Sequence, residues 1–117
     1  MTDAAHFLIV SSDAEAAAAV ALVVASMGHE ATVTLWRHAA RLEHDTTRFD
    51  AALLDAELRY EDGPGLQGRL ESRGIAVGWS MAFASFRGQQ AGVDGDANAA
   101  AELELLARLI RTLAERT

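Results

Sequence analysis

Polar side chains follow two short apolar runs of the sequence, HFLIV and FDAALL. Runs of this kind are typical of strands that are buried on both faces of a parallel sheet. The carboxyl ends of such strands form the ligand crevice, so we expect the polar residues that follow them to lie together there. A strand-end aspartate in a crevice either takes part in chemistry or only bonds backbone amides. The residues concerned are Ser11, Ser12, Asp13 and Asp55.

Other reactive groups give weaker patterns. His38 and His44 are six residues apart near Asp45, whereas helical metal ligands need a spacing of three or four, so we expect surface histidines. Ser80 lacks the GxSxG turn of a hydrolase nucleophile. There is no cysteine, and all ten basic residues are arginine, so thiolate and ammonium chemistry are both excluded.

Composition places the 117-residue chain among globular single domains. The formal net charge of −7 argues against binding to nucleic acid or to an anionic membrane. The N-terminus does not resemble a secretory signal, and the longest apolar stretch, residues 16–27, is too short to cross a bilayer of about 30 Å. We expect a cytoplasmic protein without a cofactor.

Strand and helix patterns alternate along the chain. Asp13 is placed to cap the first helix and Gly28 to end it. The last helix is amphipathic, with Leu103, Leu106 and Ile110 on its inner face together with Leu113. Strands are expected at residues 6–10, 31–36, 49–54 and 75–79, and helices at 14–27, 38–44, 66–72, from 80 through 90, and 99–115.

These patterns predict an α/β fold over residues 1–117. Alternating strands and helices with short connections form βαβ units with right-handed crossovers, and hence a parallel sheet covered on both faces. Counting five such units in a chain of this length, we expect a single doubly wound five-stranded parallel sheet, in the flavodoxin-like order 2-1-3-4-5.

Over almost its whole length, the sequence resembles the receiver domain of response regulators. FLIVSSD is similar to that family's first strand and acidic cluster, and FDAALLDAEL to its third strand, which ends in the phosphoacceptor. Asp62 with Gly63, and AGVDG from Ala91, stand where the family has matching segments. The resemblance implies phosphoryl transfer from a histidine kinase to Asp55 with Mg²⁺, and a switch hydroxyl at Ser80.

The chain differs from this family at the residues that carry out phosphoryl transfer. Ser11 and Ser12 occupy the positions of the acidic pair that holds Mg²⁺. Asp13 keeps an acid near this degenerate pocket, and we expect it to serve as a helix cap rather than as a metal ligand. The family's lysine would stand near residues 96–100, where there is none, and arginine is a poor substitute. No aromatic residue follows Phe86 to complete the switch. Phosphoryl transfer depends on electrostatic stabilisation, so we expect it to be slow.

The first helix has an unusual outer face. No charged residue lies between Glu15 and Glu30, so its solvent side is made of small apolar residues. Such a face either reflects a helix-friendly composition or packs against a partner or a second copy. At 3.6 residues per turn, one stripe contains Ala14, Ala18, Ala21 and Ala25, while Val20, Val23, Val24 and Met27 face the core.

These observations favour a pseudo-receiver that signals through protein contact, largely without phosphorylation and without enzymatic activity. Its expected partner is a histidine kinase, a phosphotransfer protein or another regulator, and a homodimer is an option. One alternative is a divergent but active receiver phosphorylated on Asp55, which would need Mg²⁺. A further alternative is a small-molecule-binding flavodoxin-like module, although no glycine-rich phosphate loop follows the first strand.

Overall fold

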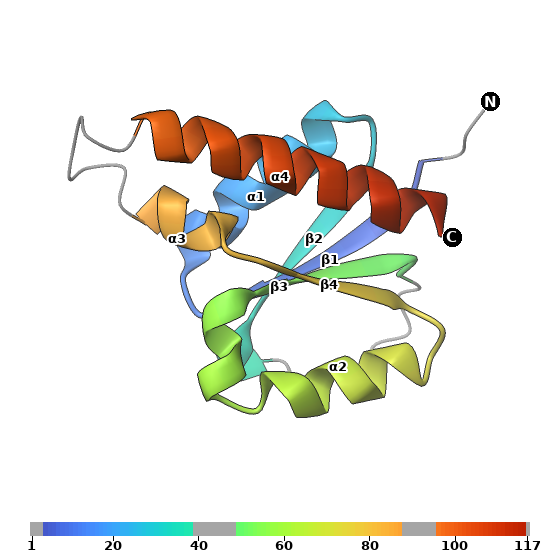
Figure 1. Ribbon diagram of the computed structural model, residues 1–117. Helices are drawn as coiled ribbons and strands as arrows, with labels where there is room; N and C mark the ends of the chain where they lie inside the picture. Colours follow the sequence, from blue (N-terminus) through green and yellow to red (C-terminus); the bar gives the residue numbers. More distant parts are fainter. Residues whose placement is uncertain (1–3, 39–48, 88–95, 117) are drawn as a thin grey trace.

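The computed structural model describes residues 4–38, 49–87 and 96–116 of the chain (Figure 1). The described elements include the four strands that the sequence predicts, with helices between the first and second strands and between the third and fourth. The strands are β1 (His6–Ser11), β2 (Glu30–Leu35), β3 (Ala51–Asp55) and β4 (Ala76–Ser80). The helices are α1 (Ala14–Ser26), the 3-10 helix η2 (Ala56–Tyr60), α2 (Gly63–Glu71), α3 (Ala82–Arg87) and α4 (Asp96–Glu115).

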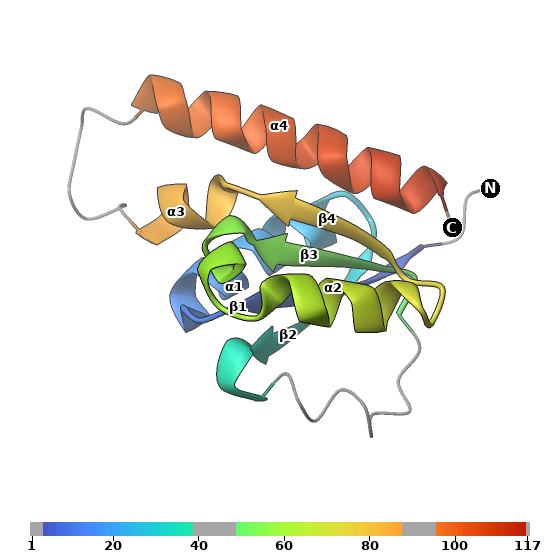
Figure 2. The ribbon, with the colours of Figure 1, turned by 60° about the horizontal axis from the view of Figure 1, so that its bottom comes forward.

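The four strands form one parallel sheet in the order β2-β1-β3-β4. β1 and β3 are central, and residues 7–10 and 51–54 are fully buried, as their apolar runs predict. Within the described residues, β2 and β4 are the two edges of the sheet (Figure 2). The α/β class and the order of the first four strands are therefore confirmed.

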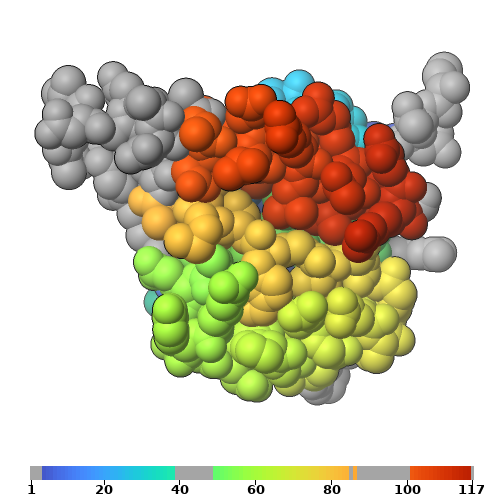
Figure 3. Space-filling model, in the orientation of Figure 1, coloured from blue at the N-terminus to red at the C-terminus, as the bar shows by residue number. Residues whose placement is uncertain are grey.

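Helices cover both faces of the sheet (Figure 1). On the first, called the α1 face, α1, α3 and α4 bury Phe7, Ile9 and Leu53. On the opposite α2 face, α2 and η2 bury Leu8 and Leu54. Figure 3 shows β4 and α3 reaching the surface between α4 and α2. Within the described residues, no helix has the length and apolarity that a membrane crossing requires.

Capping residues set the ends of α1, as the sequence predicts. Oδ1 of Asp13 accepts hydrogen bonds from the backbone N–H groups of Glu15 and Ala16, at 3.0 and 3.1 Å. The helix stops before Gly28, which adopts a φ of 89°, a left-handed conformation that favours glycine. Val20 and Val24 are fully buried. The core face predicted for α1 is correct at these two valines, while Val23 and Met27 are only partly buried.

The last helix also differs slightly from its prediction. α4 begins at Asp96, three residues before the predicted start, and buries Leu106, Ile110 and Leu113 on the sheet. Leu103, predicted to share that inner face, is 39% exposed. Gly78 in β4 lets the helix approach, because a Cβ there would lie 2.9 Å from a methyl carbon of Leu109.

The prediction of a fifth strand is wrong: the described sheet has four strands. Residues 96–100, near which the family's lysine would stand, belong to α4. A right-handed crossover to a strand beyond β4 would carry its helix on the α2 face, but α3 packs against α1 and α4. The residues of α4 are mostly alanine, leucine, glutamate and arginine, which favour helix over strand.

Some predictions fall on residues outside the described ranges. Residues 39–48 include almost all of the helix predicted at 38–44, with His44 and Asp45. Residues 88–95 include the end of the helix predicted to reach Gln90 and the segment beginning at Ala91. The helix predicted at 66–72 is present but begins earlier, at Gly63.

Candidate functional site

Three buried polar residues mark the carboxyl end of the sheet. They are Ser11, Asp55 and Ser80, with exposed fractions of 0%, 1% and 7%, the last residues of β1, β3 and β4. Within the described ranges, they are the polar residues that the structure buries. Side chains alternate along a strand, so Ser11 and Asp55 share the α1 face with the core residues Ile9 and Leu53 two positions earlier. Ser80 shares that face with Gly78, whose Cβ position lies against α4.

Asp55 is held by hydrogen bonds on both carboxylate oxygens. The Ser11 hydroxyl donates to Oδ2 at 2.8 Å, and the backbone N–H of Glu57 donates to Oδ1 at 3.0 Å. The second bond caps η2, which begins at the residue after Asp55. The aspartate therefore joins β1 to β3 and starts the helix that follows β3.

Ser80 lies opposite Asp55 in the register of β3 and β4, but its oxygen serves the next helix. The backbone N–H of Ala82 donates to Ser80 Oγ at 3.0 Å at the start of α3. Ala82 and Phe83 are buried in the core of the α1 face. Ser80 thus sits beside Asp55 on the neighbouring strand, and its oxygen supports the turn into α3.

The predicted cluster of four residues is assembled only in part. Ser11 meets Asp55 directly. Asp13 lies next to them in the chain, and its backbone N–H donates to Ser11 Oγ at 3.1 Å, but its carboxylate caps α1. Ser12 is exposed on the surface. The carboxyl-end site therefore contains one buried carboxylate and two buried hydroxyls.

These three side chains are better suited to stabilising the strand ends than to binding a metal ion. Mg²⁺ prefers octahedral oxygen coordination and is usually held by carboxylates together with water. Among the described residues, no group of three or more histidine, cysteine, aspartate or glutamate side chains is placed to hold a metal ion. Asp55 and Ser11 expose almost no surface, so a ligand would first have to separate them from their present partners.

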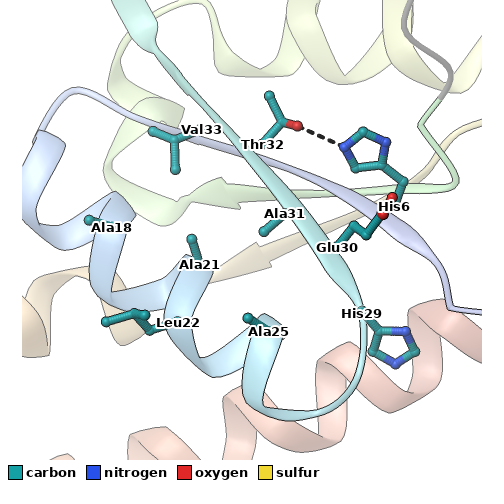
Figure 4. A pocket seen from close by; sticks show the side chains of 10 residues that line it. All are labelled: His6, Ala18, Ala21, Leu22, Ala25, His29, Glu30, Ala31, Thr32 and Val33. Atoms are coloured by element: carbon teal, nitrogen blue, oxygen red, sulfur yellow. Dashed lines mark hydrogen bonds between the residues drawn. The ribbon is translucent and has the colours of Figure 1, made fainter.

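A second feature is a shallow groove between α1 and the outer edge of β2 (Figure 4). Its volume is about 710 Å³, and its α1 side carries most of the alanine stripe predicted as an interface. Ala14 of that stripe is exposed but does not line the groove. The groove residues from α1 are Ala18, Ala21, Leu22 and Ala25.

The strand side of the groove was not predicted. β2 contributes Ala31 and Val33 on the α1 face, and the alternating polar residues Glu30 and Thr32 also line the groove at the strand edge. His6 bonds Thr32 across the strands at 2.7 Å, and His29 Nδ1 accepts the backbone N–H of Ala5 at 3.0 Å. Two features of the sequence could have predicted it. Apolar and polar residues alternate in ATVTL, and the second strand stands at the edge of the predicted strand order.

Comparison with known proteins gives no relative: no family model matches the sequence, and neither the curated proteins nor the solved structures contain a match.

Proposed function

We propose that this chain is a receiver-like signalling module that acts through protein contact and without phosphorylation or enzymatic activity. A parallel sheet in the order 2-1-3-4, with an aspartate at the end of β3 and a hydroxyl at the end of β4, supports the receiver-like part. The expected partner is a histidine kinase, a phosphotransfer protein or another regulator.

The observation that carries the phosphorylation-independent part is the state of Asp55. Only 1% of this residue is exposed, and its two oxygens accept hydrogen bonds from Ser11 and Glu57. Phosphoryl transfer needs an attacking oxygen in line with the leaving oxygen of the donor. A carboxylate enclosed in this way has to lose buried hydrogen bonds before it can reach a donor.

The residues around Asp55 support the same conclusion. The neighbouring strand ends in a serine where a metal ligand would be an acid, and Asp13 is engaged at the helix start. The chain contains no lysine to neutralise a transferred phosphoryl group. The Ser11 hydroxyl donates a hydrogen bond that helps to hold the carboxylate in place.

A Mg²⁺ titration tests this proposal at the site itself. Trp79 precedes Ser80 and Trp36 follows β2, so tryptophan fluorescence reports on this end of the sheet. We expect Mg²⁺ to bind no more tightly than about millimolar, with the same response in wild type and in Asp55→Asn. Tight binding that Asp55→Asn removes would favour an active receiver instead.

Complementation separates the two kinds of signalling in the cell. Any phenotype caused by deleting the gene should be restored equally by wild type and by Asp55→Asn, because the proposed contact does not use a phosphorylated aspartate. The variant's fold is checked by its unfolding curve. Loss of complementation by a correctly folded Asp55→Asn would support the active receiver.

A further inference from the structure

The outer edge of β2 is open among the described residues. β2 pairs with β1 on one side only, so its other side presents backbone N–H and C=O groups that are suited to another strand. Proteins usually protect such edges with charged residues, proline or bulges. β2 contains no proline and only one charged residue, Glu30 at its first position.

Apolar side chains continue this edge onto α1. Leu22 is 72% exposed beside the groove and Val33 is 39% exposed on β2. The alanines of the helix let another backbone approach closely, and helix packing depends on such approach. Figure 4 shows the groove residues of α1 on one side and those of β2 on the other.

The charges at the two ends of β2 are complementary when the strand pairs antiparallel with the β2 strand of a second copy. Exposed Glu30 begins β2, and exposed Arg37 and His38 follow its end. Antiparallel pairing brings the acidic start of one strand close to the basic end of the other, twice in a symmetric pair. Parallel pairing would instead place like charges together.

We propose that this surface binds a second copy of the chain. Two β2 strands pair antiparallel about a twofold axis, which joins the two sheets through their β2 edges, and the α1 helices meet along Ala18, Ala21 and Leu22. The interface is isologous, because each copy uses the same strand and helix. It does not depend on the proposed signalling role, since it involves neither Asp55 nor Ser80.

Light scattering after size exclusion, together with sedimentation equilibrium, tests the dimer. We expect the wild type to be a dimer with a dissociation constant in about the micromolar range. Leu22→Glu should raise that constant by about tenfold or more, and Val33→Lys provides a second disruption from the strand side. Leu105→Glu is the matched control, because Leu105 is 56% exposed on α4 and does not line the groove.

A charge exchange tests the antiparallel orientation. Glu30→Arg alone should weaken the dimer, and Glu30→Arg combined with Arg37→Glu should restore it, because the acidic and basic positions are exchanged in both copies. A wild type that stays monomeric to about 100 µM would overturn the proposal and favour an extended peptide of another protein as the occupant. Dimers unaffected by both Leu22→Glu and Val33→Lys, or a double exchange that fails to restore association, would overturn it as well.

Discussion

Ser11 donates its hydroxyl hydrogen to Oδ2 of Asp55 over 2.8 Å, and the two buried residues are 44 positions apart in the sequence. The bond links the ends of the two central strands of the sheet. It also gives the carboxylate a neutral partner inside the protein. We therefore treat this pair as the structural core of the carboxyl-end site.

Removing the Ser11 hydroxyl should lower the stability of the fold, whereas removing the hydroxyl of its neighbour Ser12 should not. Ser11→Ala leaves a buried carboxylate without one of its donors, so we expect the free energy of unfolding to fall by about 1–3 kcal/mol. Ser12→Ala is the matched control, because the neighbouring serine is exposed and its loss should change stability by no more than about 0.5 kcal/mol. Urea unfolding followed by tryptophan fluorescence measures both. Equal effects of the two substitutions would contradict the structural role of Ser11.

The capping role of Asp13 gives an independent prediction. Asp13→Ala removes the acceptor for two backbone N–H groups of α1 and should lower stability by about 0.5–2 kcal/mol. Asp13→Asn keeps an acceptor oxygen and should restore most of that loss. Thermal unfolding followed by circular dichroism distinguishes them. An Asn variant as unstable as the Ala variant would show that the negative charge, and not the cap, is what matters.

Two glycines should respond to substitution with opposite signs. At Gly78, a side chain would collide with Leu109 and Leu113 of α4, so Gly78→Leu should cost about 1–3 kcal/mol. Gly68 lies inside α2 with nothing within 4 Å of an added Cβ, so Gly68→Ala should stabilise the protein by about 0.5–1 kcal/mol. Urea unfolding curves give both values. A neutral Gly78→Leu would mean that α4 does not pack against β4 as described.

The local signals in the sequence predicted much of the fold. The apolar runs before Ser11 and Asp55 marked the central strands, and Asp13 and Gly28 marked both ends of α1. These signals are strong because each depends on a few adjacent residues and on one physical requirement, burial or capping. The position of Asp55 at a strand end followed from the same reasoning.

The missing fifth strand was not predictable from local signals. Its expectation came from counting five strand-and-helix units and from the resemblance to receivers, whereas the path of the chain after Ser80 depends on α3 and α4 packing on the α1 face. Similarly, the hydrogen bond between Ser11 and Asp55 depends on strand register, which the sequence pattern does not specify. Leu103 is exposed for a similar reason, because the packing of α4 on the sheet decides which of its residues are buried.

The most direct test of phosphorylation-independent function is the intact mass of the purified chain after incubation with acetyl phosphate and Mg²⁺. A receiver domain that is known to accept phosphate, purified in the same way, serves as the positive control for the reagent. We predict an unmodified mass for wild type and for Asp55→Asn, because the carboxylate is buried, bonded on both oxygens and without a lysine beside it. A mass increase of one phosphoryl group in the wild type that Asp55→Asn abolishes would contradict the proposal.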